Sequence, residues 1–356
     1  MDFNQLEVKS KRFEAADSVE LGFQLPEGLI ENFRFVPGQY ITVATQIDGE
    51  PLRRAYSICS DIWSNELRIL VKKVPGGKMS TYIMDQLEVG QQLMIAAPNG
   101  GFKVNIDELN DGDDLVLIGA GSGITPLMSI IQSTLKSDKK ITCHLIYGSR
   151  NRDAIIYKEK FERLSLVYKD DLRIHHFISD GVIGSQDQSN EFIKYHVGRI
   201  NTSAFDKIIS ELPAASIFGF YLCGPGKLIE SSIEDLSKAG FSKSKIHQEY
   251  FTADTGEKFD IDFGDLAERT VQVHLDGKEI TSVINGETDI LRQLIDDGYE
   301  PPYSCLQGTC STCKAKLISG EVKMRVDIGL EEDEKVNGYI LTCQSVPISE
   351  TVVCKY

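Results

Sequence analysis

The sequence predicts a multidomain protein in which an antiparallel β-barrel precedes an α/β domain with a doubly wound parallel sheet, and a small α+β domain follows. Three observations predict this order. Short strand-like runs dominate the first ~105 residues, strand-like and helical stretches alternate from about residue 113, and a cysteine-rich loop lies near the C-terminus. The 356 residues suffice for two or three domains of roughly 150 residues each.

Composition and charge narrow the class of protein. Hydrophobic residues make up 41% of the chain and charged residues 26%, which is typical of globular proteins. No apolar run reaches the ~20 residues of a membrane span, and the start lacks a secretory signal, so we expect a cytoplasmic protein. The net charge of −15 argues against nucleic-acid binding. The negative charge either keeps the protein soluble or steers it toward a basic partner.

Two domains account for the first 251 residues. The β-barrel is expected over residues 1–105, where runs such as 40–43 and 67–71 are separated by Pro and Gly turns. The α/β domain is expected over residues 112–251. Its strand-like runs, with helical stretches between them, are 115–118, 141–147, 172–178 and 218–222. Strands that alternate with helices indicate a parallel sheet.

A linker and a third domain complete the chain. Residues 252–268 are polar and acidic without a clear period, so we expect a linker there. In the last domain, residues 269–356, Asp276-Gly277 separates two strand-like runs and predicts a hairpin. Residues 265–356 carry nine Lys and Arg against 16 Asp and Glu, so this end of the chain is acidic.

The strongest chemical signal is the spacing of four cysteines. Cys305, Cys310 and Cys313 lie within one loop, and Cys343 follows 29 residues later. This is the spacing of plant-type [2Fe–2S] ligands, and the small residues between the cysteines let backbone amides approach the sulfur atoms. Structural zinc is the alternative, but zinc sites more often pair one CxxC with another. The other four cysteines are scattered through the chain.

Residues 270–356 resemble a plant-type ferredoxin domain. The resemblance rests on Pro302-Tyr303-Ser304-Cys305, Cys310-Ser311-Thr312-Cys313, Gly320-Glu321-Val322 and Leu341-Thr342-Cys343-Gln344. It implies a β-grasp-like fold, with Cys305, Cys310, Cys313 and Cys343 as the metal ligands.

Two segments of the barrel resemble the flavin contacts of the ferredoxin–NADP reductase superfamily. Arg54-Ala55-Tyr56-Ser57 matches its RxYS motif, in which the Arg contacts the flavin pyrophosphate, the Tyr stacks on the ring and the Ser lies near N5. The second segment comprises Val71, Lys72, Lys73, Gly77, Lys78, Met79, Ser80 and Thr81. The resemblance implies FAD, and FMN stays open.

A glycine-rich loop follows the first strand of the α/β domain and predicts a nicotinamide-nucleotide site. Gly121 and Gly123 permit a tight turn, and a helix N-terminus behind them favours a pyrophosphate. We expect Thr125 to cap this helix and Pro126 to lie in its first turn. An ordinary strand–helix turn is the alternative.

Further motifs of the same superfamily support a hydride-transfer site. Cys223-Gly224-Pro225 matches the CGP motif, whose Cys lies beside the nicotinamide, and Glu249-Tyr250-Phe251 resembles the segment that closes the nucleotide domain near the flavin. The resemblance therefore implies Ser57, Cys223 and Glu249 as catalytic candidates, with Gly224, Pro225 and Phe251 among the cofactor contacts.

The choice between NADPH and NADH rests on a few residues. Ser149, Arg150 and Arg199 resemble sites that hold the 2′-phosphate of NADPH, whereas Asp180 stands where some NADPH-specific relatives carry Arg. We predict NADPH, and NADH stays open. Two other features favour ordinary structural roles: the adjacent His175 and His176, which a strand would point to opposite faces, and the acidic run 331–334, for which partner docking is the alternative.

The order of the three domains implies an electron relay from NADPH through FAD and a [2Fe–2S] cluster to an oxygenase. Among families with this order, the chain most resembles the reductase subunits of ring 1,2-phenylacetyl-CoA epoxidases, including the tail Gly338–Gln344. Reductases of other oxygenases, hydroxylases and desaturases share the architecture. A general NAD(P)H-dependent electron carrier and a nucleotide-binding redox sensor remain alternatives.

Overall fold

The computed structural model describes residues 1–180, 191–212, 214–251, 263 and 268–356. These residues divide into two compact units, Asp2–Glu249 and Tyr250–Tyr356, which we describe separately. The predicted linker, residues 252–268, lies outside the described residues except for Phe263 and Glu268. None of the helices in the described ranges is long and apolar enough to cross a membrane.

The N-terminal half of the first unit is an antiparallel sheet in the order β4-β3-β6-β1-β2-β5. Its strands are β1 (Phe3–Ala15), β2 (Ser18–Gln24), β3 (Tyr40–Ile47), β4 (Glu50–Ser57), β5 (Leu67–Lys72) and β6 (Gln92–Ala96), with helix α1 (Lys78–Asp85). The outer strands meet through a bridge between Ile58 and Ile69, and the Cys59 amide bonds the Arg68 carbonyl, so the sheet curls into a barrel.

Local chemistry explains the hairpin between β3 and β4. Asp48 and Gly49 have φ angles of 54° and 79°, and two positive φ angles in a row are what a two-residue turn between twisted strands requires. The same geometry recurs at Asp276 and Gly277, with φ angles of 50° and 76°. The hairpin predicted at Asp276-Gly277 is therefore confirmed, and Asp48-Gly49 carries the same signal for a hairpin that was not predicted.

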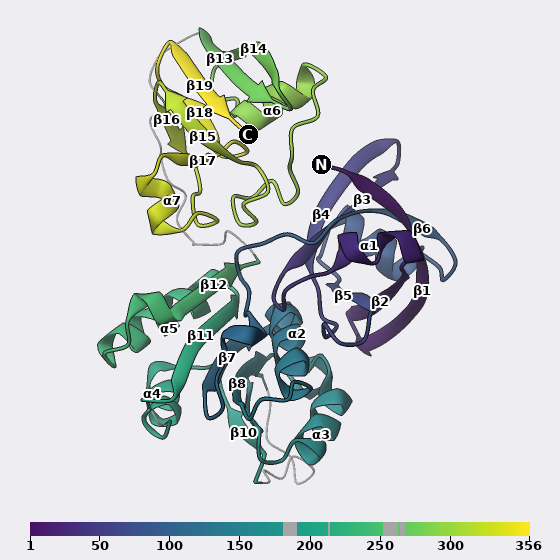
Figure 1. Ribbon diagram of the computed structural model, residues 1–356, viewed down its shortest axis with the longest axis vertical. Coiled ribbons are helices and arrows are strands. Elements are labelled where there is room, and N and C mark those ends of the chain that lie inside the picture. Colours follow the sequence, from purple (N-terminus) through teal and green to yellow (C-terminus); the bar gives the residue numbers. More distant parts are fainter. Residues whose placement is uncertain (181–190, 213, 252–262, 264–267) are drawn as a thin grey trace. The chain divides into compact units, whose positions relative to one another are not determined.

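The C-terminal half of the first unit contains a sheet in the order β10-β9-β8-β7-β11-β12. The pairings from β10 to β11 are parallel. The strands are β7 (Asp114–Ala120), β8 (Thr142–Ser149), β9 (Leu172–Ile178), β10 (Ile193–Val197), β11 (Ile217–Gly224) and β12 (Ile246–Tyr250). The helices are α2 (Ile124–Leu135), α3 (Lys158–Val167), α4 (Thr202–Ser210) and α5 (Gly226–Lys238). Helices cover both faces, with α2 and α3 on one side and α4 and α5 on the other (Figure 1).

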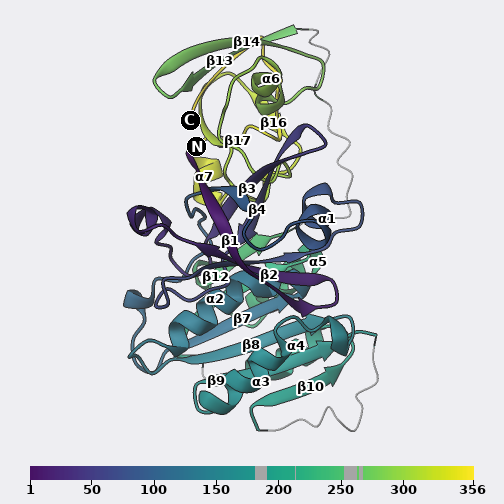
Figure 2. The same ribbon diagram turned by 90° about the vertical axis from the view of Figure 1, so that its right-hand side faces the viewer.

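The strand order places a switch point between β7 and β11. The chain runs outward from β7 through β8 and β9 to β10, then returns to place β11 on the other side of β7. Helix α2 lies against β7 and β8 in both views of the molecule (Figures 1 and 2). Ligands of open α/β sheets bind where the strand order reverses, beyond the carboxyl ends of the strands.

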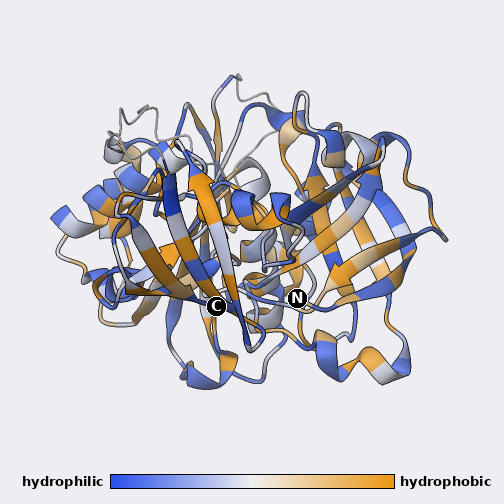
Figure 3. Cartoon of the chain, turned by 90° about the horizontal axis from the view of Figure 1, so that it is seen from above, coloured by the Kyte–Doolittle hydropathy of each residue, from blue (hydrophilic) through white to orange (hydrophobic). Residues whose placement is uncertain are grey.

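The second unit is a small mixed sheet in the order β14-β13-β19-β15-β17, with a separate pair formed by β16 and β18. Its elements are β13 (Glu268–Leu275), β14 (Lys278–Asn285), α6 (Ile290–Asp296), β15 (Lys314–Ser319), β16 (Val322–Met324), α7 (Glu332–Val336), β17 (Tyr339–Leu341), β18 (Ser345–Pro347) and β19 (Thr351–Lys355). β13 pairs antiparallel with β14 and parallel with β19. Hydrophobic and hydrophilic residues alternate along strands of both units (Figure 3).

The predicted fold class is confirmed, because the chain contains the antiparallel barrel, the doubly wound parallel sheet and the α+β domain in that order. The long strands β1 and β2, which lack flanking Pro-Gly turns, and the short strands β10 and β12 were not predicted from the sequence. The domain boundaries themselves stay predictions.

Candidate functional site

Two of the predicted nucleotide motifs meet at the switch point, backbone against backbone. A Cβ atom built on Gly123 would lie 2.1 Å from the Cys223 carbonyl oxygen, so no other residue fits without moving the chain. Gly121 has a φ angle of 56°, and Gly224 a φ angle of 151° beside the backbone of Ala120. The glycines therefore allow the loop after β7 and the end of β11 to touch.

Helix α2 begins at this loop with no side chain capping it. Its N-cap is Gly123, and the Thr125 hydroxyl donates to the Ser122 carbonyl at 2.7 Å. The expectation that Thr125 caps the helix is therefore wrong, because Thr125 lies inside the helix and its hydroxyl satisfies a carbonyl of the preceding turn. Pro126 lies in the first turn, as expected. The uncapped amides suit the pyrophosphate of a nucleotide.

The three catalytic candidates come together although they are far apart in the sequence. The Ser57 hydroxyl donates to Oε2 of Glu249 at 3.2 Å, and Sγ of Cys223 lies 3.9 Å from the same oxygen. Ser57 ends β4 of the barrel, Cys223 lies near the end of β11, and Glu249 lies on β12. The structure thus joins the end of the RxYS motif to the switch point.

Burial sets the protonation of this group. It raises the pKa of Glu249 to about 8, so the carboxyl is largely protonated at neutral pH although its side chain retains some exposure. Burial, with the neighbouring Glu249, also raises the pKa of Cys223, which therefore stays a thiol. The site thus holds a proton on a carboxyl and a neutral sulfur, with no net charge to repel a reduced cofactor.

Arg54 and Tyr56 share one face of β4, because alternate residues of a strand point the same way. Arg54, Ala55 and Tyr56 are all half-exposed, so neither face of β4 is fully covered here. Tyr56 also packs against the barrel core. The Arg54 guanidinium donates to the Arg53 carbonyl at 2.7 Å. A half-covered aromatic next to an arginine fits a flavin ring and its pyrophosphate.

The second flavin segment divides into exposed and buried residues. Val71 and Met79 belong to the barrel core, and the buried Ser80 hydroxyl accepts a bond from the Val74 amide. Helix α1 begins after Gly77 without a side-chain cap, so its first amides are available to an anion. Any contact from Val71, Met79 or Ser80 would use the backbone.

The lysines of this segment differ in their surroundings. Lys73 pairs with Asp85 at 2.6 Å and Lys78 pairs with Glu50, all of them exposed or nearly so. Lys72 pairs with Asp17 at 3.4 Å and also approaches the nucleotide loop, since its ammonium lies 3.8 Å from the position of a Cβ on Gly121. The predicted flavin and nucleotide segments are therefore neighbours.

The residues predicted to select NADPH lie at the end of β8 and in the segments that follow β8 and β10. The Ser149 hydroxyl is buried and has no hydrogen-bond partner among the described residues, and Arg199 is exposed. Arg150 approaches Asp180 at 3.9 Å, with both side chains well exposed. An orphaned buried hydroxyl and two exposed cations in these loops fit a polar ligand at this edge of the sheet.

The four cysteines predicted as metal ligands form two pairs. The Cys305 and Cys310 thiols are hydrogen-bonding neighbours, as are those of Cys313 and Cys343. Within the described ranges, no three or more His, Cys, Asp or Glu side chains converge as a single metal ion would require. Two pairs of thiols fit a two-iron cluster, with one pair for each iron, better than they fit one tetrahedral zinc.

Donors surround the sulfur atoms. The Gln307 amide donates to Sγ of Cys305 at 3.3 Å, and Thr312 Oγ1 lies 3.2 Å from Sγ of Cys310. Nε2 of Gln344 donates to Sγ of Cys343 at 3.5 Å. The bond from the Cys310 thiol lowers the pKa of Cys305, as do neighbouring amides. Donors placed at the ligand sulfur atoms are what cluster ligation needs.

Left-handed backbone shapes this loop. Leu306 and Ser311 have φ angles of 59° and 54°, and Gly308 has one of 72° with the Val326 carbonyl 3.0 Å from where its Cβ would be. The Leu306 carbonyl is held by Nε2 of Gln344 at 3.1 Å. The cysteine loop is therefore preformed by the polypeptide and fits the predicted [2Fe–2S] group.

The adjacent histidines and the acidic run 331–334 make structural contacts. Nδ1 of His175 lies 3.0 Å from Nε2 of His196, while His176 packs against Tyr147 on the other face. The acidic run forms the start of α7: Glu331 and Glu334 make a capping box, and Glu334 pairs with Lys314. Partner docking by this run stays a prediction.

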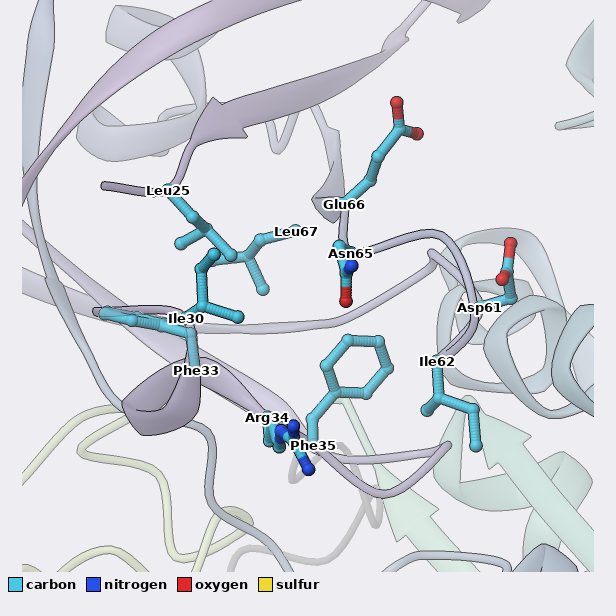
Figure 4. Close-up of a pocket in the computed structure, with 10 residues that line it drawn as sticks. All are labelled: Leu25, Ile30, Phe33, Arg34, Phe35, Asp61, Ile62, Asn65, Glu66 and Leu67. Atoms are coloured by element: carbon cyan, nitrogen blue, oxygen red, sulfur yellow. The ribbon is translucent and has the colours of Figure 1, made fainter. Parts of the chain in front are cut away.

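A cavity of about 370 Å³ opens elsewhere on the barrel. Its walls are mostly apolar, and Phe35 and Leu67 point into it while Glu66 points away (Figure 4). None of the predicted site residues lines it. The predicted site residues therefore gather at the switch point and the cysteine loop, not in this cavity.

Sequence reasoning missed several residues that fix the site. The Tyr147 hydroxyl holds the Gly121 carbonyl at 2.8 Å, and the polar residues of α2 bond the segment after Ser57. The contact made by the polar residues of α2 did have a signal in the sequence. Polar residues recur there with the period of a helix, at i, i+3, i+4 and i+7: Ser129, Gln132, Ser133 and Lys136. Tyr147 lies in an apolar strand and offers no such signal.

Comparison with known families agrees with the three domains. The oxidoreductase FAD-binding domain matches residues 5–104, the oxidoreductase NAD-binding domain residues 117–233, and the 2Fe-2S iron-sulfur cluster binding domain residues 273–347. Together with the geometry, these matches define an oxidoreductase that takes electrons from NAD(P)H and carries FAD and a [2Fe–2S] cluster. The chain belongs to the ferredoxin–NADP reductase superfamily, among the members with a C-terminal ferredoxin domain that serve as electron-transfer components of oxygenases.

Relatives of known activity match nearly the whole chain. One component of the 1,2-phenylacetyl-CoA epoxidase of Escherichia coli K12 is 32% identical over 99% of this chain and 98% of its own. The ferredoxin reductase component of 3-ketosteroid-9-alpha-monooxygenase from Mycobacterium tuberculosis is 29% identical over 99% and 95%. The structure of phthalate dioxygenase reductase has the same fold, with a TM-score of 0.62, 23% identity and coverage of 99% and 98%.

Proposed function

We propose that this protein is the reductase of a phenylacetyl-CoA epoxidase, taking hydride from NADPH and delivering electrons to the oxygenase component in the cytosol. The observation that carries the reductase role is the meeting of Ser57, Glu249 and Cys223 at the switch point between barrel and parallel sheet. The full-length similarity to a component of the Escherichia coli epoxidase supports the choice of partner.

The flavin is held by residues of the barrel. The Arg54 fork pairs with the pyrophosphate, the free amides at the start of α1 share that charge, and Tyr56 covers the ring. Among the other residues of this site, Ala55, Lys72, Lys73, Gly77, Lys78 and Thr81 line the binding surface, while Val71, Met79 and Ser80 contribute backbone.

The nucleotide is held across the switch point. The amides at the start of α2 bind its pyrophosphate, while Gly121, Gly123 and Gly224 let the chain approach it closely. Pro225 begins the turn into α5, and Phe251 closes the site. Cys223 packs beside the nicotinamide as a neutral thiol, and Ser57 and Glu249 hold a proton near the position of flavin N5.

When bound, FAD accepts a hydride and the iron–sulfur cluster passes electrons singly. The chain contributes orientation and electrostatics. Cys305 with Cys310 and Cys313 with Cys343 would each hold one iron, and the donors beside Cys305 and Cys343 would bond their sulfur atoms.

Reconstitution tests the partner. The purified protein, NADPH, oxygen and phenylacetyl-CoA are combined with the oxygenase component of a phenylacetyl-CoA epoxidase, and product is measured against NADPH consumed. We expect tightly coupled turnover. The matched comparison uses the oxygenase components of a 3-ketosteroid-9-alpha-monooxygenase and a glycine betaine monooxygenase, whose reductases are also relatives of this chain. Equal turnover with all three would indicate a general electron carrier and contradict a dedicated partner.

We also predict a preference for NADPH over NADH. The exposed Arg150 and Arg199 offer charge to a 2′-phosphate, and each charge-assisted bond contributes about 1.5–3 kcal/mol, which is at least roughly tenfold in affinity. Replacing both arginines by alanine should lower kcat/KM for NADPH by about 100-fold and leave NADH nearly unchanged. The exposed Arg163 on α3 is the control. A wild-type preference for NADH would overturn this prediction and favour a role for Asp180.

A further inference from the structure

A polar stripe on α2 bonds the segment that directly follows the flavin motif. The stripe comprises Ser129, Gln132 and Ser133 of α2 together with Lys136, its C-cap residue, and their spacing is that of one helical face. The segment Cys59–Trp63 begins two residues after Ser57, and α2 begins one residue after Gly123. The stripe and this segment therefore join the chain that follows the flavin strand to the helix that follows the nucleotide loop.

Five bonds join the stripe to the segment Cys59–Trp63. Ser129 donates to the Ser60 carbonyl at 2.7 Å, and Gln132 to the Cys59 carbonyl at 2.8 Å. The next three bonds run from the Ile62 amide to the Ser133 hydroxyl at 3.2 Å, from the Trp63 indole to the Ser133 carbonyl at 2.8 Å, and from Lys136 to Asp61 at 2.6 Å.

The buried groups at this joint depend on the stripe. Cys59 and Ser60 are almost wholly buried, and Ser129 and Ser133 have no exposed surface. Their carbonyls and hydroxyls cannot turn to water when a bond is lost. Apolar surfaces can slide over one another, whereas directional bonds to buried partners fix the register of α2 against the barrel.

A second set of bonds joins the barrel to α3. Glu20 of β2 is buried and lies 2.9 Å from Arg68 of the barrel and 3.3 Å from Lys160 of α3. The Cys59 thiol also approaches this carboxylate, with its Sγ 3.7 Å from Oε2 of Glu20. Cys59 therefore takes part in both sets of bonds. Two separated sets of bonds oppose rotation of the parallel sheet and its helices against the barrel, as well as sliding.

We infer that the stripe on α2 and the segment Cys59–Trp63 position the nicotinamide over the flavin, so that these residues control the rate of hydride transfer without contacting either cofactor. This inference rests on the proposed function. The hydride passes from C4 of the dihydronicotinamide to N5 of FAD, which breaks one C–H bond, forms one N–H bond and leaves the oxidised nucleotide. A transfer of this kind depends steeply on the distance between donor and acceptor.

The test uses the full-length holoprotein with two variants, Gln132→Leu and Lys136→Met. Rapid mixing with NADPH measures the limiting rate of flavin reduction and the apparent Kd of the nucleotide. We expect the rate to fall by roughly 10- to 100-fold in the double variant while the Kd changes little, because the binding residues are untouched. The long-wavelength absorbance that arises when the nicotinamide stacks on reduced flavin should weaken in parallel.

Two controls separate positioning from general damage. Thr134→Val removes a buried hydroxyl of the same helix that has no partner among the described residues, and should leave rate and absorbance unchanged. Lys136→Arg keeps a cation opposite Asp61, so this variant should keep most of the wild-type rate of flavin reduction. FAD content and Tm of all variants are measured alongside.

The outcomes distinguish the two proposals. If the wild-type flavin is not reduced by NADPH or NADH, the proposed function fails. If the wild type is reduced rapidly and the double variant matches it in both rate and stacking absorbance, the inference about the stripe is overturned. A variant that loses stacking absorbance in proportion to FAD content alone would also overturn it.

Discussion

Replacing Cys310 by serine is expected to remove the iron–sulfur cluster and to stop electron delivery to protein acceptors. Cys310 shares its pair with Cys305, and a serine hydroxyl is a much poorer ligand for iron than a thiolate, because it is far harder to deprotonate. Cytochrome c reduction driven by NADPH should fall by about 100-fold or more, because loss of an outer-shell partner alone costs about 10- to 100-fold. Reduction of ferricyanide, which can take electrons from the flavin, should persist. Iron content and visible absorbance report the cluster directly.

Cys354→Ala is the matched control for this change. Cys354 lies in the same unit and is fully buried, but it belongs to the core of the sheet and not to either cysteine pair. Its loss should cost about 1 kcal/mol of stability through the small cavity and leave iron content unchanged. A Cys310→Ser protein with full iron and normal cytochrome c reduction would contradict the ligand assignment.

Gly123→Ala is expected to damage stability and hydride transfer together. The new Cβ would lie 2.1 Å from the Cys223 carbonyl oxygen, a backbone atom that can move only by displacing the end of β11. Overpacking of this kind costs about 1–3 kcal/mol or more. Displacement of Cys223 by about 1 Å should lower the rate of flavin reduction by about 100-fold. Denaturant unfolding and rapid mixing with NADPH measure the two effects.

Gly101→Ala provides the comparison for Gly123. A Cβ on Gly101 meets nothing within 4 Å, so that variant should match the wild type in both measurements. Near-normal stability and flavin reduction in Gly123→Ala would mean that the loop and β11 do not have to touch for activity.

Motifs whose chemistry is local could be predicted from the sequence. The RxYS strand, the glycine loop and the run from Cys305 to Cys313 each lie in one short segment, and the first two occupy the predicted kind of element. The hairpin at Asp276-Gly277 follows from backbone conformation alone. The predicted Thr125 cap failed for a local reason as well, since Gly123 and not Thr125 occupies the N-cap and the hydroxyl bonds backward.

Contacts between distant segments required the tertiary structure. No pattern along the chain states that Ser57 and Glu249 share a hydrogen bond across 192 residues, or that Glu20 meets Lys160 across 140. Likewise, the spacing of the cysteines does not state that they divide into the pairs Cys305 with Cys310 and Cys313 with Cys343.

The sequence by itself determined that this protein is built for a flavin, a nicotinamide nucleotide and a [2Fe–2S] cluster, and it determined the order of the domains that carry them. These properties depend on residue types and short spacings, which thiolate chemistry and backbone conformation constrain directly. Only the tertiary structure decided that Glu249 is a protonated carboxyl with a pKa of about 8 and that α2 is bonded to the segment after the flavin strand. Burial and directional bonds arise when the sheets pack, because only then do distant groups lose water and meet.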